Sequence, residues 1–448
     1  NGDFMLKRKI DSFLLDWKQK KEKKPLVVTG ICQVGKTTSI EKLKDQYEVF
    51  IKIDFANNPK YIEIFEKKYN FTSILKNISS LNEKVKFIPN KTLLFFDNVE
   101  LCLNALEAAK LFKENKDFDV IYSGFTLEMY DKIKEVEPFI EEYRLYPLDF
   151  EEYLWAEGYD ADIIEDLYVS LTKMQQLKSE KSSRFSYLFR KYTCIGGLPK
   201  AVDESLKSDV LNKVFDAQAE VFNYTCERLG SYIDELGIPK YKCLYANVST
   251  QLMRDNHKFT ISKLYPKARF KDYNDIIAKL INSGMINRCY GLNAIILPFE
   301  GKEKLDNFHL YYTEHSMLLL KYNIKIIKKL TGDNNSVDYN CALQESLVDE
   351  ALTRMNIDHY FYKNKDYSVE FDFVIADGNE IIPIEVKSYR DRGISLKSVL
   401  KGDYNVHYGI RLSENTLSYN KGIFTIPYYC LFLLKRFLYE KCYLNFNK

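Results

Sequence analysis

The feature that most constrains this chain is a run near its N-terminus, Gly30-Ile31-Cys32-Gln33-Val34-Gly35-Lys36-Thr37. It has the pattern G-x-x-x-x-G-K-T, and it follows the apolar run Leu26–Val28 and precedes a stretch expected to be helical. In that setting the glycines let backbone N–H groups face phosphate oxygens, and the helix N-terminus adds partial positive charge. The sequence therefore predicts a phosphate-binding loop within an α/β domain that is built on a parallel sheet.

The first third of the chain alternates strand-like and helix-like stretches. A helix is expected directly after the loop, from Lys36 to about Tyr47, and another over Leu103–Asn115, where apolar residues recur at helical spacing. The expected strands are residues 24–29, 48–55, 91–97, 119–123 and 143–148. Crossover connections between these strands predict right-handed βαβ units.

Polar residues in and beside the loop predict a nucleotide site. Lys36 would reach the β- and γ-phosphates, and the Thr37 hydroxyl would coordinate magnesium. Asp97 ends an apolar strand at the carboxyl edge of the sheet, where it would hold magnesium in the Walker B role. Ser123 ends the next strand and is expected to sense the γ-phosphate. The predicted ligands of ATP and Mg²⁺ are Gly30, Gln33, Val34, Gly35, Lys36, Thr37, Thr38, Asp97 and Ser123.

Length and composition set the outer bounds. A chain of 448 residues is expected to form roughly two to four domains. Lys and Arg total 65 against 63 Asp and Glu, so no overall charge drives binding to nucleic acid or membrane. No apolar run reaches the roughly 20 residues that span a bilayer, and the N-terminus lacks the apolar core of a signal peptide. Nine scattered cysteines fit a reducing compartment, so a soluble cytoplasmic protein is expected.

The five histidines show no metal-binding spacing. None stands in an H-x₃₋₅-H pattern or beside a cysteine pair, so the sequence does not predict a structural zinc site. We interpret them as surface or half-buried residues. They are His257, His309, His315, His359 and His407.

The chain becomes helical after Phe150. Residues 178–184, rich in Ser, Lys and Glu, suggest an exposed loop, and residues 239–297 suggest a helix-turn-helix unit with a helix over 269–283 and two short wing strands around Gly291. Such a unit either contacts DNA or serves only in packing. The basic residues at the start of its second helix are Lys263, Lys267, Arg269 and Lys271. The predicted domains are residues 1–155, 156–232, 233–331 and 332–448, with a linker over 332–336.

Several motifs together resemble one family. They are Gln33-Val34-Gly35-Lys36-Thr37-Thr38, Phe95-Phe96-Asp97, Tyr122-Ser123-Gly124, the run from Leu145 to Leu154, and Gly196-Gly197-Leu198-Pro199. The chain is similar over nearly its whole length to bacterial and archaeal AAA-type ATPases that carry a C-terminal domain of unknown function, DUF4143. The resemblance implies ATP as ligand, a helical lid, a winged-helix middle and a C-terminal domain similar to the PD-(D/E)xK nuclease fold.

The chain departs from the family pattern at two places. Thr29 and Cys32 replace the two arginines of the first motif, and Asn98 stands where most such ATPases have a glutamate after the Walker B aspartate. Asn98 can hold a water but cannot accept its proton. Glu100 would substitute only if the chain stays extended beyond Asp97. The sequence therefore predicts nucleotide binding with slow or conditional hydrolysis.

Residues 367–388 predict a hairpin at the C-terminal end. With the two-residue loop Gly378-Asn379, Asp372 lies across from Glu385, and a cation between them would relieve their repulsion. The parts of a nuclease-like magnesium site are then Glu345, Asp372, Glu385 and Lys387. Nearby basic residues that would follow a phosphate backbone are Lys363, Lys365, Arg390, Arg392 and Lys397. From the residues alone, a solvated charged face joined by Glu370 and Lys387 is an equal alternative.

Three functions remain open from the sequence. The first is an ATP-binding AAA-type switch whose nucleotide state biases the C-terminal domains. The second is an ATP-regulated, metal-dependent nuclease, and the third is a DNA or protein scaffold with a structural nucleotide. Arg144 is a guess for an arginine finger, and the sequence indicates no oligomeric state.

Overall fold

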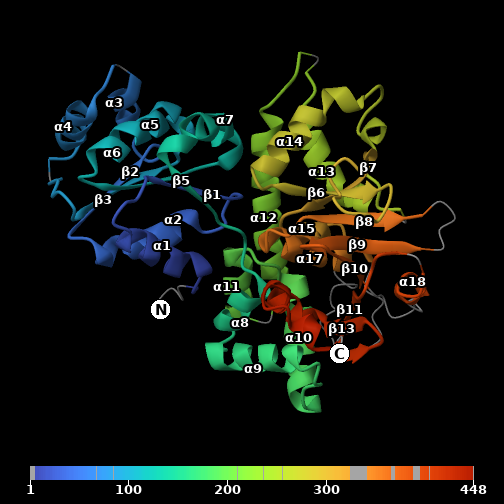
Figure 1. Ribbon diagram of the computed structural model, residues 1–448. Helices are drawn as coiled ribbons and strands as arrows, with labels where there is room; N and C mark the ends of the chain where they lie inside the picture. The colour runs from blue at the N-terminus through green and yellow to red at the C-terminus, as the bar shows by residue number, and fades with distance from the viewer. Residues whose placement is uncertain are drawn as a thin grey trace. The chain divides into compact units, whose positions relative to one another are not determined.

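The computed structural model describes residues 6–446 except 67, 84, 209, 236, 255, 323–340, 365–368, 387–393 and 403. The chain divides into two compact units. The first consists of Asn1–Tyr146 and Asp275–Met285, and the second of Pro147–Asn274 and Ile286–Lys448. Each unit is described by itself, with the element labels of Figure 1.

The first unit is built on a five-stranded sheet with the order β2-β3-β4-β1-β5. All of its pairs are parallel, which confirms the predicted parallel α/β domain. The strands are β1 Leu26–Thr29, β2 Val49–Asp54, β3 Thr92–Asp97, β4 Asp119–Ser123 and β5 Glu141–Arg144. The last lies earlier in the chain than the strand predicted over residues 143–148.

Helices cover both faces of this sheet, which explains its continuous apolar strands. Leu93 and Phe95 of β3 join a core with residues of α1 and α2, whereas Leu94 and Phe96 join the core on the opposite face (Figure 1). The helices of this unit are α1 Lys9–Gln19, α2 Lys36–Glu41, α3 Glu63–Glu66, α4 Phe71–Leu81, α5 Leu103–Glu107, α6 Ala109–Asn115, α7 Thr126–Val136 and α14 Asn274–Asn282.

Two helices predicted for the first unit are interrupted. The helix after the loop ends at Glu41 and continues as a 3₁₀ segment, Lys42–Gln46. The helix predicted over Leu103–Asn115 is divided at Ala108 into α5 and α6. In both places the spacing of apolar residues correctly predicted a helix but did not predict where that helix is interrupted.

The second unit begins with a set of helices. They are α8 Phe150–Ala156, α9 Ala161–Thr172, α10 Ser179–Ile195, α11 Pro199–Lys207, α12 Leu211–Gly230 and α13 Lys240–Leu252. The exposed loop predicted over residues 178–184 is wrong, because α10 starts at Ser179. Ser182 is buried there and its hydroxyl contacts Asn415, so tertiary packing overrides the polar local composition.

An eight-stranded sheet follows, with the order β12-β13-β11-β10-β9-β8-β6-β7. Its strands are β6 Ile286–Leu292, β7 Glu303–Tyr312, β8 His359–Lys363, β9 Glu370–Asp377, β10 Glu380–Val386, β11 Gly409–Ser413, β12 Ser418–Asn420 and β13 Ile423–Pro427. The remaining helices are α15 Ser316–Leu319, α17 Cys341–Arg354, α18 Ile394–Val399 and α19 Leu434–Tyr439.

The expected wing is different in the structure. The two short strands predicted around Gly291 are wrong, because this stretch is the single strand β6, which pairs with β7 and β8 in the eight-stranded sheet. That sheet therefore runs across the domain boundary predicted at residues 331 and 332, which itself lies outside the described residues. The predicted second helix begins only at Asn274, after a 3₁₀ turn over Phe270–Asp272.

The hairpin of β9 and β10 has the predicted register. Asp377 pairs with Glu380 and Phe373 with Ile384, so the next pair along the ladder is Asp372 with Glu385. Gly378 has φ 59°, a left-handed conformation that suits glycine in a two-residue turn. Among the described residues, every helix is too short or too polar to cross a bilayer.

Candidate nucleotide-binding site

The loop between β1 and α2 has the backbone that its glycines predict. Gly30, Gln33 and Gly35 have φ values of 143°, 57° and 95°. A Cβ on Gly30 would lie 2.2 Å from the carbonyl oxygen of Leu145, so only glycine fits there. Val34 is fully buried and anchors the loop, while Gln33 and Thr38 are exposed.

The ammonium group of Lys36 lies within the loop. Its Nζ donates to the carbonyl oxygen of Gly30 at 3.0 Å and to that of Ile31 at 2.9 Å. These are the groups that a phosphate would replace as partners of the lysine. The loop backbone therefore surrounds the ammonium group of Lys36.

The carboxylate of Asp97 is the centre of the site. It is buried at the end of β3, and its Oδ2 accepts a hydrogen bond from the Thr37 hydroxyl at 3.0 Å. Its Oδ1 accepts one from the Ser123 hydroxyl at 2.6 Å. The structure thus brings together the predicted metal ligands Thr37 and Asp97 and the predicted sensor Ser123.

A lysine that the sequence analysis did not single out also reaches this carboxylate. Lys52 of β2 lies 3.2 Å from Oδ2 of Asp97 and 2.9 Å from Glu41. Partial burial works against its charged form, but Glu41 and Asp97 raise the pKa of Lys52 above its ordinary value. The local signal for Lys52 was only its place two register pairs before the end of β2, beside β3.

Asp54 is a second carboxylate beside Asp97 that the sequence analysis missed. Asp54 and Asp97 are register partners at the ends of β2 and β3. The amide of Asn98 donates to Oδ1 of Asp54 at 2.8 Å. Burial would raise the pKa of Asp54, but hydrogen bonds from Asn57 and Asn98 hold it below its ordinary value. Asp54 is therefore an ionised carboxylate in contact with the residue that replaces the usual glutamate.

Glu100 does not continue the strand. Asn98 has φ 57°, and residues Val99–Leu101 form a 3₁₀ turn. Glu100 was expected to replace the usual glutamate as a base only if the chain stayed extended, and the chain is not extended here. The carboxylate of Glu100 accepts a hydrogen bond from the backbone N–H of Phe125 at 2.9 Å and lies against Gly124. It supports the turn after β4.

Two buried polar residues hold the loop from outside and were also missed. Thr126, the first residue of α7, accepts from the N–H of Gly30 at 2.8 Å and donates to its carbonyl at 3.1 Å. Arg8 donates to the carbonyls of Val34 at 3.1 Å and Tyr146 at 2.6 Å. Arg144, the guessed arginine finger, donates to the carbonyl of Asn282 within the same unit.

The predicted C-terminal acids lie on neighbouring elements of the second unit and have different partners. Glu385 accepts from Arg411 at 3.1 Å and from the N–H of Leu396 at 2.9 Å. Asp372 accepts from the N–H of Val386 at 2.6 Å. Burial, and then the nearby carboxylate of Glu345, raise the pKa of Asp372 well above its ordinary value. Lys387, Lys365, Arg390 and Arg392 lie outside the described residues.

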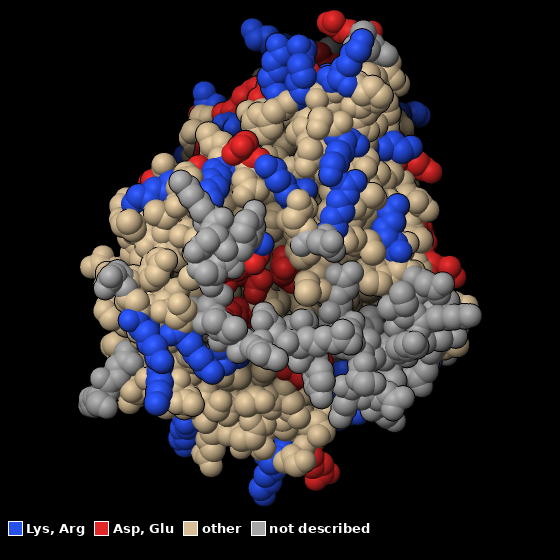
Figure 2. Space-filling view, turned by 90° about the vertical axis from the view of Figure 1, so that its right-hand side faces the viewer, with Lys and Arg blue, Asp and Glu red and all other residues tan. Residues whose placement is uncertain are grey.

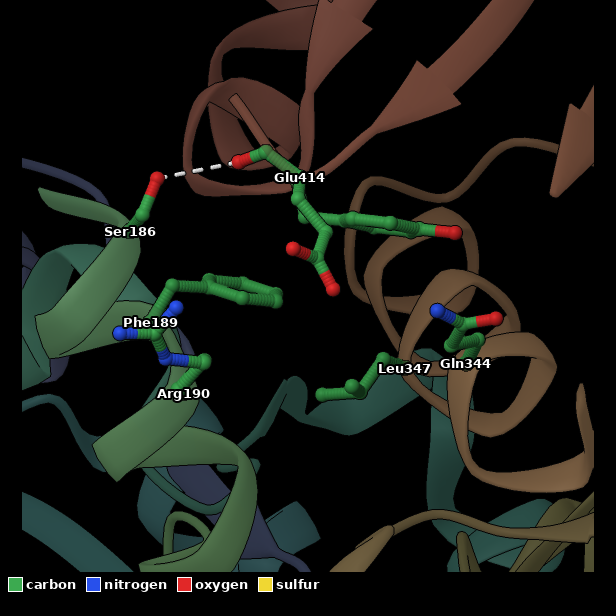
Figure 3. A pocket seen from close by; sticks show the side chains of 7 residues that line it. Ser186, Phe189, Arg190, Gln344, Leu347 and Glu414 are labelled. Carbon is green, nitrogen blue, oxygen red and sulfur yellow. Dashed lines mark hydrogen bonds between the residues drawn. The ribbon is translucent and has the colours of Figure 1, made fainter. Parts of the chain in front are cut away.

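The second unit also contains a small pocket beside α10 and α17 (Figure 3). Arg190 and Glu414 face it together with Phe189 and Leu347, and the Ser186 hydroxyl donates to the carbonyl of Glu414. Figure 2 shows acidic side chains gathered in a hollow on one face, with Lys and Arg side chains spread around them. The described residues therefore do not form a continuous basic patch on that face.

A parallel five-stranded sheet with this loop, and with Asp97 at its carboxyl edge, defines a P-loop nucleoside triphosphatase fold. Residues 22–154 match the family described as an AAA domain, and residues 340–431 match the domain of unknown function DUF4143. The chain therefore combines an AAA-type P-loop ATPase domain with a C-terminal DUF4143 domain. No curated protein matches its sequence.

Several solved structures are similar to this chain, including the three that follow. A Walker-type ATPase of Pyrococcus abyssi has 12% identity and a TM-score of 0.41, over 68% of this chain and 93% of that one. Drosophila ORC bound to DNA has 11% identity and a TM-score of 0.26, over 62% and 78%. A DNA replication initiation factor has 11% identity and a TM-score of 0.26, over 55% and 70%.

The contact of Thr126 with Gly30 predicts an effect on ligand affinity. Thr126→Val keeps the shape but leaves the buried N–H of Gly30 without its acceptor, which costs about 1–3 kcal/mol. We expect nucleotide affinity to fall by about tenfold or more, because each ~1.4 kcal/mol changes the dissociation constant tenfold. Calorimetric titration measures it, with Thr172→Val, at the end of α9 in the second unit, as control. Unchanged affinity in Thr126→Val would show that the loop keeps its shape without this contact.

Proposed function

We propose that this protein binds ATP and Mg²⁺ and acts as a nucleotide-dependent switch with slow or conditional hydrolysis. The observation that carries the proposal is the contact of Asp97 with both Thr37 and Ser123 beside a loop already closed around Lys36. Hydroxyl and carboxylate oxygens are the ligands that Mg²⁺ prefers. In the cell we expect the protein in the cytoplasm.

The residues present fit the proposed ligands. The loop backbone would cradle the phosphates, and Lys36 would exchange its carbonyl partners for phosphate oxygens. Thr37 and Asp97 would hold Mg²⁺, directly or through water. The ion supplies electrostatic stabilisation of the phosphates when bound. Lys52 now lies beside Asp97, so we expect its ammonium to withdraw when the ion binds, because two cations would then compete for one carboxylate.

Hydrolysis needs a group that orients and deprotonates water. Asn98 offers an amide only, and Glu100 is held by the N–H of Phe125. Asp54 is the carboxylate in contact with Asn98. We propose that Asp54 takes the proton of the attacking water through one bridging water molecule, while the Asn98 amide orients the attacking water. A base that acts through a bridging water is poorly placed, which supports slow turnover.

The central prediction concerns binding. Lys36→Ala removes the charge that offsets the phosphates, so we expect it to abolish binding of ATP and ADP in the presence of Mg²⁺. Isothermal titration calorimetry on the full chain measures this, with Lys20→Ala, an exposed lysine of the same unit, as the matched control. Failure of the unaltered protein to bind any nucleotide would overturn the proposed function.

A separate prediction concerns turnover. Loss of a general base typically costs about 10²–10⁴ in rate, so Asn98→Glu should speed phosphate release under saturating Mg-ATP. Asp54→Asn should lower the residual rate, and Glu100→Gln should change it little because glutamine still accepts from Phe125. Phosphate-release assays on the four proteins compare these rates. Fast hydrolysis by the unaltered protein, indifferent to Asp54→Asn, would contradict the argument.

A metal-dependent nuclease is the second candidate, with a PD-(D/E)xK-like C-terminal domain and DNA contact by that domain and by the basic stretch over residues 263–271. The observation that favours it is the hairpin register, which puts Asp372 across from Glu385. Burial, and then the carboxylate of Glu345, also raise the pKa of Asp372. We propose that nucleotide state at the loop biases these C-terminal parts. The partners would then be nucleotide and DNA.

Cleavage of plasmid DNA in Mg²⁺ or Mn²⁺ tests the nuclease. We expect Asp372→Ala to abolish cleavage, because Asp372 would be a metal ligand. Asp306→Ala, an exposed acid of β7, is the control. Salt-sensitive retention of DNA without cleavage would favour the scaffold, and cleavage that persists in Asp372→Ala would exclude the predicted acids.

A further inference from the structure

Three side chains with metal-binding chemistry meet in the second unit, far apart in the chain. His257 lies in the loop after α13, His309 lies on β7, and Glu345 lies on α17. One ligand atom from each lies within 4.8 Å of the others. Nδ1 of His257 is 2.7 Å from Oε2 of Glu345. Glu345 is buried and both histidines are partly buried.

His309 is held by the arrangement that fixes a metal-binding imidazole. Nδ1 of His309 lies 3.1 Å from the hydroxyl oxygen of Tyr311, which can accept its N–H. The Tyr311 hydroxyl also donates to Oε2 of Glu345 at 3.0 Å. An imidazole that donates through one nitrogen keeps a lone pair on the other, and such outer contacts set its orientation.

A glycine makes room for a ring that supports His309. Phe361 of β8 stacks on the His309 ring, with centroids 4.1 Å apart and planes at 12°. These residues lie on opposite sides of β6, where Gly291 has no side chain. A Cβ there would lie 2.8 Å from Phe361. The missing side chain thus lets Phe361 cross β6 and reach the histidine.

His257 is turned toward the same point by its backbone. It has φ 49°, a left-handed conformation that few non-glycine residues adopt, although histidine does so more often than most. Such strain persists only where surrounding contacts hold it. Here the contact is with Glu345.

We propose that His257, His309 and Glu345 bind a divalent transition-metal ion of the zinc class. Two imidazoles and one carboxylate form a three-ligand set that leaves an open position in tetrahedral geometry. Imidazole nitrogens favour Zn²⁺ over Mg²⁺, which takes oxygen ligands. The site is separate from the nucleotide loop and requires neither ATP binding nor nuclease activity.

A second cluster of similar composition differs from the proposed metal site, because a positively charged side chain already contacts its acids. Glu314, His315 and Glu350 also lie within 4.8 Å of one another. The guanidinium of Arg354 lies 2.5 Å from Glu350, however, so a cation already balances those acids. Such a fixed charge would repel a metal ion. Among the described residues, Glu345 forms no ion pair with a lysine or arginine, and its side chain contacts His257 and Tyr311.

Zinc titration of the full chain, stripped with chelator, tests the proposal. We expect about one equivalent of Zn²⁺ per chain, retained with excess Mg²⁺ and measured by calorimetry and elemental analysis. His257→Ala, His309→Ala and Glu345→Gln should each weaken binding by at least about tenfold to a hundredfold. His407→Ala is the matched control, because His407 pairs with Glu380 at 2.8 Å on the surface and has no third ligand in either described metal cluster.

Gly291→Ala gives a test that keeps all three ligands. Its Cβ should displace Phe361, release the His309 ring and weaken Zn²⁺ binding by about tenfold or more, while circular dichroism shows the fold retained. Absence of zinc binding in the unaltered protein would overturn the proposal. Binding that survives His309→Ala but is lost in Asp372→Asn would also overturn it, because the ion would then be held by the carboxylates.

Discussion

The nucleotide site depends on one buried carboxylate at the edge of the parallel sheet. Asp97 accepts hydrogen bonds from Thr37 and Ser123 and lies 3.2 Å from Lys52. These residues lie on β3, α2, β4 and β2, so a single side chain ties together the ends of the elements around the loop. A buried carboxylate needs such partners, because its charge is costly to remove from water. Under the proposed function, a bound magnesium ion would engage Thr37 and Asp97 and displace Lys52, so the contacts of this carboxylate would change with the ligand.

Close packing of the backbone explains two sequence motifs to which no catalytic or ligand-binding role is assigned. The N–H of Leu148 donates to the carbonyl of Gly197 at 2.7 Å, and a Cβ on Gly197 would lie 2.1 Å from the Leu148 carbonyl. Gly197 also donates to Glu314 at 3.1 Å, next to the buried pair of His315 and Glu350. Two of the motifs that carry the family resemblance, the run from Leu145 to Leu154 and Gly196-Gly197-Leu198-Pro199, therefore meet at these residues. The glycines of the second motif permit close packing of backbone around buried charge, which is a structural role.

The sequence predicted what local patterns determine. The loop, the strand before it and Asp97 were found because apolar runs and the G-x-x-x-x-G-K-T spacing are contiguous, and the register of β9 and β10 followed from a two-residue turn at Gly378. The prediction from sequence failed where contacts between residues far apart in the chain determine the local structure. The polar start of α10 is helical because Ser182 is buried against Asn415, and β6 is one strand because β7 and β8 pair with it. Some residues that support the site belong to no sequence motif, so the sequence did not reveal them. They are Arg8, Lys52, Asp54 and Thr126. His315 is fully buried, which corrects its expected place at or near the surface.

Glu345 shows why residue type alone left the C-terminal chemistry open. The sequence grouped it with Asp372 and Glu385 as a set of carboxylates, and the structure gives each acid different neighbours. Arg411 forms an ion pair with Glu385 at 3.1 Å, which reduces the charge that this acid offers to a cation. Glu345 is instead in contact with His257 and close to His309. Histidines separated by about fifty residues leave no spacing signal, yet they add two neutral nitrogen donors beside a carboxylate. This change in donor type, from oxygen alone to nitrogen and oxygen, favours a transition-metal ion over magnesium at Glu345.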